Sequence, residues 1–268
     1  MSESNHWYFS EQQILDSPSR SKGVSPDKEE YNRQQAAALI QELGQRLGVT
    51  QLCINTAIVY MHRFYMFHSV TTFHRNDIAA SSIFLAAKVE EQPQRLEKFI
   101  NTLNICIYQE QSTLNLTSAK YLGQTQELLA NENVLLETFG FDMNIIHPHI
   151  YITKGCQLFK ASKELFQTAY LLATNSLHLT TLCLRYQPSM VACVCIQLAC
   201  IWSKYKIPDS EQEKSWFLYI DKNATITLID KITQEFLYIL EKSPNKIRKA
   251  NQQIFEEQNQ HNKKLKMK

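Results

Sequence analysis

Two oppositely charged side chains stand out because each lies on the apolar face of a helical pattern. Lys88 closes a run of small and apolar residues, and Glu132 falls in a stripe of leucines spaced by seven. These leucines are Leu122, Leu129 and Leu136. A charge on such a face is costly unless it reaches water or an opposite charge. We therefore expect Lys88 and Glu132 to lie together and to present a polar pair, framed by apolar side chains, to a partner. In the alternative, Lys88 simply extends into solvent and Glu132 marks a wet edge of its helix.

Residues that could support catalysis or hold a metal do not form a recognisable constellation. The six glycines are scattered and build no phosphate-binding loop. Cys193 and Cys195 are about 200° apart on a helix and cannot share one metal ion. His147-Pro148-His149 has no nearby cysteine or acidic residue and is typical of a turn. We expect a binding protein with no catalytic residue, no cofactor and no metal.

Composition places this binding protein in a reducing compartment. The chain has 268 residues and seven cysteines, an odd number without disulfide-like spacing. The N-terminus is polar, and no run of about 18 apolar residues offers a membrane span. The formal net charge is +2, but residues 246–268 hold seven Lys or Arg against two Glu, so the rest of the chain is slightly acidic.

Apolar residues recur at helical spacing along the first half of the chain, without strand-like alternation. We expect one helix ending at Gly48, a second around Ile54 to Tyr65, and a third that is buried on every side. The third should begin after the N-cap candidates Asn76 and Asp77 and stop before Pro93. A fourth covers about 96–107, and a fifth covers 118–139.

A similar pattern restarts in the second half. At an offset of 113 residues, Ile83 matches Ile196 and Leu85 matches Leu198, within a second small-residue helix at 188–204. This weak repeat predicts an all-α fold of two tandem five-helix domains, over 31–144 and 147–243. An N-terminal extension (1–30) with a short helix from Ser10 to Asp16 precedes them, and a basic tail (244–268) follows. The aromatic cluster at 7–9 is expected to pin the extension to the first domain.

The motifs resemble those of the cyclin family over residues 7 to about 245. The carrying features are Ala86-Ala87-Lys88-Val89-Glu90-Glu91 and, later, Glu132 before Phe141-Asp142. Within the cyclins the chain is similar to the transcriptional cyclin T group. The stretches that carry this closer likeness are Trp7-Tyr8-Phe9 with residues 17–20, then residues 55–66, and the segments 174–181 and 191–200, of which the last two discriminate most.

The resemblance implies a regulatory subunit without catalytic groups of its own. It would bind and activate cyclin-dependent kinase 9, as part of the positive transcription elongation factor that phosphorylates the tail of RNA polymerase II in the nucleus. The resemblance assigns the kinase contacts to six residues. They are Leu85, Lys88, Val89, Glu132, Leu136 and Phe141. In the second repeat Ile201 stands where Lys88 stands in the first, so this function would be confined to the first domain.

Two other interpretations remain open from the sequence. A cyclin of the K type, activating a different kinase, shares the run from His62 to Met66. A nucleic-acid-binding protein of the transcription-factor-IIB type uses the same helical repeats, but it should show a basic face, and residues 1–245 are slightly acidic. The basic tail is either solvated or a contact for RNA or a regulatory protein.

Overall fold

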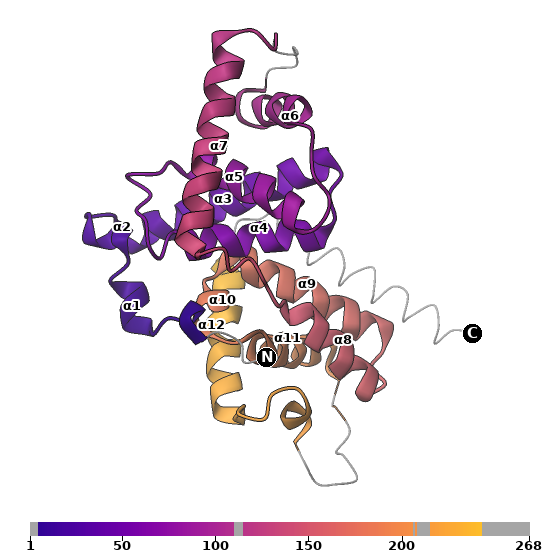
Figure 1. Cartoon of the computed structure of the whole chain (residues 1–268). Coiled ribbons are helices and arrows are strands. Elements are labelled where there is room, and N and C mark those ends of the chain that lie inside the picture. The colour runs from indigo at the N-terminus through magenta and orange to yellow at the C-terminus, as the bar shows by residue number, and fades with distance from the viewer. Residues whose placement is uncertain (1–4, 110–114, 206, 208–214, 243–268) are drawn as a thin grey trace. The chain divides into compact units, whose positions relative to one another are not determined.

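The chain folds into two compact helical units. The computed structural model describes residues 5–109, 115–205, 207 and 215–242, and every regular element among these residues is a helix (Figure 1). Unit 1 comprises Met1–Ile146 with Thr181–Arg185, and unit 2 comprises His147–Thr180 with Tyr186–Lys268. The predicted basic tail, 244–268, lies outside the described residues.

Unit 1 is organised around one central helix. Its elements are η1 (Asn5–Trp7), α1 (Glu11–Leu15), α2 (Pro18–Ser21), α3 (Pro26–Leu47), α4 (Gln51–Phe64), α5 (Arg75–Val89), α6 (Leu96–Tyr108), α7 (Ala119–Phe139) and α10 (Leu182–Arg185). Every residue of α5 from Ile78 to Ala87 is buried, and the helix packs against α3, α4 and α7. Small residues such as Ala79 and Ala86 allow this close approach. The prediction of a helix buried on every side is confirmed.

The start of α5 differs from the sequence prediction. The helix begins at Arg75, and His74 is its N-cap, with Nδ1 accepting a hydrogen bond from the Asn76 amide at 3.3 Å. Asn76 and Asp77 instead lie inside the first turn, where the Asp77 carboxylate favours the positive end of the helix dipole. Histidine ranks below asparagine and aspartate as an N-cap residue. The sequence therefore predicted a start of this helix that lies too late in the chain.

Helix α4 is also buried on every side, from Cys53 to Phe64. Its C-terminal carbonyl groups would then be left without partners, but Arg33 of α3 supplies donors. Arg33 donates to the carbonyl oxygens of His62 at 2.9 Å and Tyr65 at 3.1 Å. The sequence alone does not show this capping interaction, because Arg33 lies 29 residues upstream of His62.

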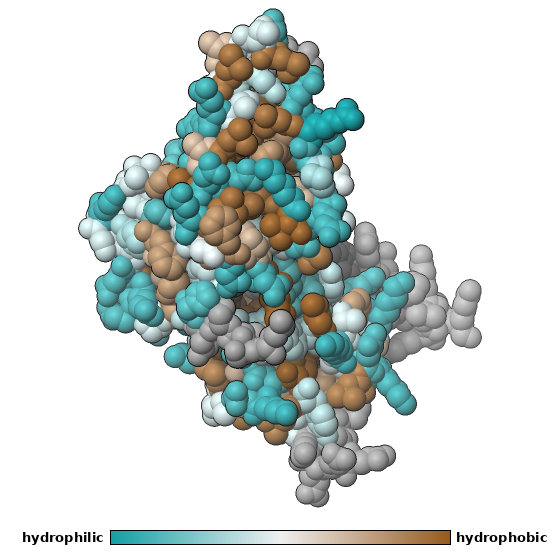
Figure 2. Space-filling model, viewed as in Figure 1, coloured by the Kyte–Doolittle hydropathy of each residue, from teal (hydrophilic) through white to brown (hydrophobic). Residues whose placement is uncertain are grey.

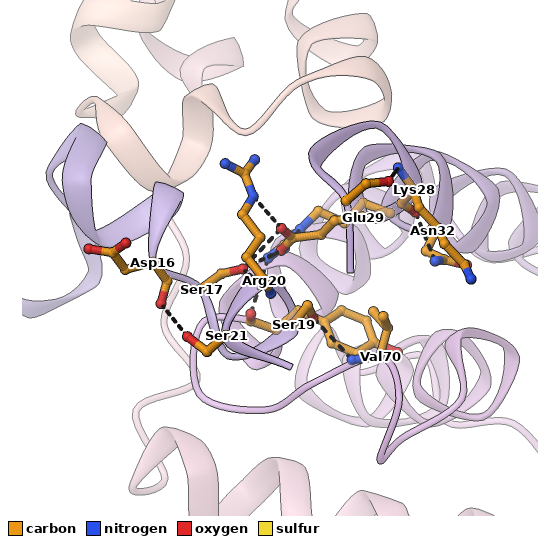
Figure 3. A network of polar contacts seen from close by, with 12 residues as sticks. Asp16, Ser17, Ser19, Arg20, Ser21, Lys28, Glu29, Asn32 and Val70 are labelled. Atoms are coloured by element: carbon orange, nitrogen blue, oxygen red, sulfur yellow. Dashed lines mark hydrogen bonds and ion pairs between the residues drawn. The ribbon is translucent and has the colours of Figure 1, made fainter. Parts of the chain in front are cut away.

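A buried carboxylate joins the segment before α3 to the body of unit 1 (Figure 3). Glu29 accepts hydrogen bonds from Ser17 Oγ at 2.9 Å and from Arg20 Nε at 2.8 Å, and it pairs with Arg33 at 3.0 Å. Ser19 Oγ in turn accepts from the Val70 amide at 3.1 Å. The contacts of Ser17, Arg20 and Arg33 satisfy the charge of Glu29 where water is excluded.

Unit 2 repeats the arrangement of unit 1. Its elements are α8 (Pro148–Leu158), α9 (Lys163–Leu179), α11 (Pro188–Ser203), η2 (Trp216–Tyr219) and α12 (Ile226–Lys242). Helix α11 begins 113 residues after α5 and packs against α8, α9 and α12, as α5 packs against α3, α4 and α7. The short helix η2 takes the place of α6 among the described residues. The tandem repeat is confirmed.

Candidate functional site

The last turn of α5 and the interior of α7 bring the two charges together. Lys88 Nζ lies 2.7 Å from Oε1 and 2.8 Å from Oε2 of Glu132, 44 residues further along the chain. The Lys88 side chain is 44% exposed and that of Glu132 only 7%. The ammonium also lies 4.4 Å from the centroid of the Phe84 ring, one helical turn earlier. The expected pair therefore exists, with its carboxylate enclosed and its ammonium at the surface.

The buried face of α7 differs from the predicted stripe. Glu132 shares the buried face with Tyr121, Leu128, Leu135 and Phe139. The leucines predicted to line this face, Leu122 and Leu129, are exposed. The seven-residue spacing does place these leucines in one line along the helix. That line, however, lies beside the face of α7 that α5 and α6 cover. Hydrophobic atoms consequently reach the surface along α7 (Figure 2).

The other four predicted contact residues differ in exposure. Val89 is 38% exposed and Phe141 is 71% exposed, whereas Leu136 is half-buried and Leu85 belongs to the core. We call the surface formed by Lys88, Val89, Glu132, Leu136 and Phe141 the α5–α7 edge. Leu85 is buried below the surface that these residues form, so it is not available for the direct contact with a partner that was predicted for it.

Phe141 adopts an uncommon backbone conformation at the end of α7. Its φ is 62°, in the left-handed region, directly after the C-cap Gly140. Its amide donates to the Leu136 carbonyl at 3.1 Å, which closes the helix end. The left-handed conformation costs a non-glycine residue about 1–2 kcal/mol. An aromatic side chain held at this cost and exposed to solvent is typical of a binding surface.

The N-terminal extension anchors the loop that carries Phe141. Trp7 Nε1 donates to Asp142 Oδ2 at 2.9 Å, and the Trp7 ring meets Phe139 edge-on with centroids 5.8 Å apart. The guanidinium of Arg63 lies 4.5 Å from the Trp7 ring centroid. The expectation that the aromatic cluster pins the extension onto unit 1 is confirmed. Sequence reasoning did not foresee that Trp7 would bind the residue next to Phe141.

Phe84 was also missed as a site residue. It lies four positions before Lys88 in α5, the spacing at which side chains meet on a helix. That spacing was the available signal for its contact with the ammonium. Phe84 is itself buried, so it orients Lys88 from below rather than offering a surface to a partner.

The described residues contain no group of three or more His, Cys, Asp or Glu side chains able to hold a metal ion. Burial raises the pKa of the Cys193 thiol to about 12, so this thiol stays protonated and weakly nucleophilic. His147 and His149 are both buried, and His149 Nε2 is 3.0 Å from Thr174 Oγ1. Among the described residues, no helix is long and apolar enough to cross a membrane. The α5–α7 edge is therefore the best-developed surface on which to base a function.

Comparison with known families identifies the class of this protein. The family model of the cyclin N-terminal domain matches residues 5–144, and that of the cyclin-T2-like C-terminal domain matches residues 147–239. The first match alone covers more than half of the chain. The chain therefore belongs to the cyclin family.

Within that family the chain is similar to cyclins of the T group. It is 54% identical to Cyclin-T1 of Bos taurus over 243 residues, which are 91% of this chain and 33% of that relative. It is 55% identical to Cyclin-T of Drosophila melanogaster over 242 residues (90% and 22%), and 53% identical to Cyclin-T2 of Homo sapiens over 246 residues (92% and 34%). The chain thus spans about a third or less of the length of these relatives.

Solved structures show the same fold at low identity. A chain of the yeast RNA Pol II CTD kinase CTDK-1 complex matches with a TM-score of 0.69 and 17% identity, over 88% of this chain and 73% of that chain. A chain of the CAK complex of Chaetomium thermophilum bound to ATP-gamma-S matches with a TM-score of 0.59 and 16% identity (96% and 86%). At this identity the likeness concerns the fold alone.

Proposed function

We propose that this chain is a kinase regulatory subunit and that the α5–α7 edge is its kinase-binding surface. The observation that carries the proposal is the Lys88–Glu132 ion pair, whose half-exposed ammonium lies at the surface of unit 1 and is followed in the chain by exposed Val89. Family membership supports a regulatory rather than a catalytic role. Two structures of the same fold come from an RNA Pol II CTD kinase complex and from a complex that holds an ATP analogue.

The edge suits an amphipathic helix of the partner. Phe141 and Val89 offer apolar contact, and Leu136 lies between the ion pair and Phe141 along α7 and its C-terminal turn. A central charge pair bordered by apolar groups fixes the register of such a helix. The half-exposed Lys88 ammonium has donors left for a carbonyl or carboxylate of the partner, because an ammonium carries three.

The mechanism is a shift between conformations of the kinase. In protein kinases an ion pair between a strand lysine and a helix glutamate positions the ATP phosphates. A cyclin that holds that helix inward stabilises the active arrangement and contributes no chemical group. The cyclin can shift this equilibrium only by binding the active form of the kinase more tightly than the inactive form.

The kinase we propose is cyclin-dependent kinase 9, and the process is elongation by RNA polymerase II in the nucleus. The support is the identity of 53–55% to cyclins of the T group. Because the chain spans about a third of those relatives, contacts made elsewhere in them could contribute further specificity. A cyclin of the K type with another kinase is the second candidate.

The decisive experiment measures kinase binding and activity together. Cyclin-dependent kinase 9 is assayed on a polymerase-tail peptide alone, with this chain, and with its Glu132→Ala variant. We expect activation by the wild-type chain and a loss of binding of about 100-fold in the variant, since truncating one member of an interfacial charge pair costs about 2–5 kcal/mol.

Glu137→Ala is the matched control, because Glu137 lies on the same helix, is exposed, and faces away from Glu132. It should bind and activate as the wild type does. Equal losses in both variants, or an unfolded Glu132→Ala protein with unchanged binding per folded molecule, would contradict the assignment of the site. Activation of a different transcriptional kinase, but not of cyclin-dependent kinase 9, would support the second candidate.

A further inference from the structure

Every Ser-Pro pair of the chain is followed by a basic residue at the third position after the serine. The three stretches are Ser17-Pro18-Ser19-Arg20, Ser25-Pro26-Asp27-Lys28 and Ser243-Pro244-Asn245-Lys246. Lys and Arg make up 28 of the 268 residues, so chance would place a basic residue there about one time in ten. A serine before proline, with a basic residue two positions beyond the proline, is the substrate pattern of proline-directed protein kinases. The third stretch lies outside the described residues.

The first of these serines is enclosed in the folded chain. The Ser17 side chain is buried, and its Oγ donates to Glu29 Oε2 at 2.9 Å (Figure 3). Arg20, the basic residue of the same stretch, donates to Glu29 through Nε at 2.8 Å. Ser19, between them, is also buried and accepts a hydrogen bond from the Val70 amide. A kinase could reach the Ser17 hydroxyl and the Arg20 guanidinium only after this network had been broken.

The second serine is exposed, and so are the three residues that follow it. Ser25 is the N-cap of α3 and has an extended backbone, with φ −65° and ψ 152°. Its Oγ accepts a hydrogen bond from the Lys28 amide at 3.4 Å, and its carbonyl oxygen accepts one from the Glu29 amide at 3.0 Å. Because helix ends fray, loss of these two bonds presents residues 25–28 to a kinase while the Glu29 side chain keeps its buried partners.

We propose that Ser25 is a phosphorylation site for a proline-directed protein kinase, and that burial protects the matching stretch at Ser17. In the transfer, Ser25 Oγ attacks the γ-phosphorus of ATP and the bond from that phosphorus to the β,γ-bridging oxygen breaks. ADP leaves, and the hydroxyl proton passes to the catalytic aspartate of the kinase. The Lys28 ammonium pairs with a carboxylate of the kinase, which selects this serine by charge.

The test is phosphorylation of the full chain by cyclin-dependent kinase 2 bound to cyclin A. This kinase complex carries its own cyclin, so the outcome is independent of the kinase assignment made above. Tandem mass spectrometry of a tryptic digest separates the sites, because Ser25 falls in the peptide 23–28 and Ser17 in the peptide 1–20. We expect phosphate on Ser25 and a rate about 100-fold lower at Ser17, which is reached only by opening of the buried network.

Two lysine variants test the proposed recognition of the basic residue. Lys28→Ala should lower the rate at Ser25 about fivefold, the effect of losing one exposed ion pair. Lys22→Ala is the matched control, because it removes an exposed lysine three positions before the serine rather than three positions after it. Its rate should equal that of the wild type. Equal losses in both variants, or no loss in Lys28→Ala, would overturn the role of Lys28.

Two synthetic peptides show what the sequence pattern permits without the fold. Residues 11–23 contain Ser17, and residues 19–31 contain Ser25. Both peptides should be phosphorylated at similar rates, because only the folded chain encloses Ser17. A Ser17 peptide that stays unmodified would overturn the protective role of burial. Equal rates at Ser17 and Ser25 in the folded chain, or no phosphate on Ser25, would overturn the proposal itself.

Discussion

The two units share one architecture but differ at the end of their central helices. In unit 1 the edge carries the Lys88–Glu132 pair, whereas the corresponding positions in unit 2 are Ile201 and Thr233. Ile201 follows Lys88 at the 113-residue offset of the central helices. Thr233 corresponds to Glu132 when α12 is aligned with α7 at an offset of 101 residues. The same offset aligns the buried positions Leu128 with Ile229 and Leu135 with Phe236.

The comparison separates what the repeat needs to fold from what it needs to bind. Ile201 is 52% exposed, and Thr233 is buried without a hydrogen-bond partner for its hydroxyl among the described residues. Unit 2 therefore packs its last helix without a charge pair at this place. Since the fold does not require the pair, its presence in unit 1 favours a role in recognition.

The largest expected effect concerns the buried ion pair between Glu29 and Arg33 in unit 1. Arg33→Met should lower the free energy of unfolding of unit 1 by about 3–5 kcal/mol, because it leaves Glu29 with one guanidinium fewer and uncaps α4. Trp7 fluorescence, in a background with Trp202 and Trp216 changed to Phe, reports on unit 1. Arg46→Met, which breaks the half-exposed pair with Glu42 on the same helix, is the control and should cost less than about 1 kcal/mol.

Unit 2 should be sensitive to mild acid through His149. Burial lowers the pKa of His149 from its ordinary value of 6.5 to about 4. Between those values the unfolded chain binds a proton that the folded chain does not, so stability present at pH 7 is lost as the pH falls. The expected loss is on the order of 3 kcal/mol. His178 shifts in the same direction.

Denaturation at several pH values, followed by the fluorescence of Trp202 and Trp216, measures this loss. His149→Phe should reduce the slope of stability against pH between 6.5 and 4, and the slope that remains is expected to come from His178. A profile of equal slope in the variant would show that other groups govern the acid response of unit 2.

Replacing the charge pair of the α5–α7 edge with the corresponding residues of unit 2 tests whether the pair serves folding or recognition of the kinase. Lys88→Ile alone leaves Glu132 enclosed without its counter-ion and should destabilise unit 1 by about 2 kcal/mol, less than for a fully buried pair because Lys88 is half-exposed. Adding Glu132→Thr should restore part of the stability, because no enclosed charge is then left without its counter-ion. Kinase binding should remain lost in the double variant. Recovery of binding together with stability would make the pair structural only.

The smallest effect concerns the left-handed residue at the end of α7. Phe141→Gly should leave stability unchanged or raise it by about 1 kcal/mol, because glycine adopts a φ of 62° without the steric cost. Kinase binding should fall in the same variant, since the exposed ring is removed. Phe141→Ala keeps the cost and removes the ring, so it should be less stable than Phe141→Gly while binding equally weakly.

The sequence determined the helices, the repeat and the caps that depend on neighbours in the chain. Ser10 caps α1, Gly48 ends α3 and Gly140 ends α7, as expected from side-chain type and backbone freedom alone. The central helix α5 was recognisable as buried because it is apolar over its whole circumference. The helices and their caps are local features, so a window of one helix contains the information that specifies them. The repeat follows from comparing two such windows 113 residues apart.

Tertiary structure decided which face of each helix is covered and what satisfies its polar groups. The burial of Leu128 rather than Leu129 depends on where α5 and α6 cross α7. The donors to α4 come from Arg33, and the anchor beside Phe141 comes from Trp7, 135 residues before its partner Asp142. A helical pattern gives the period of apolar residues but not the direction from which neighbours pack, because that direction is set by contacts between residues far apart in the chain.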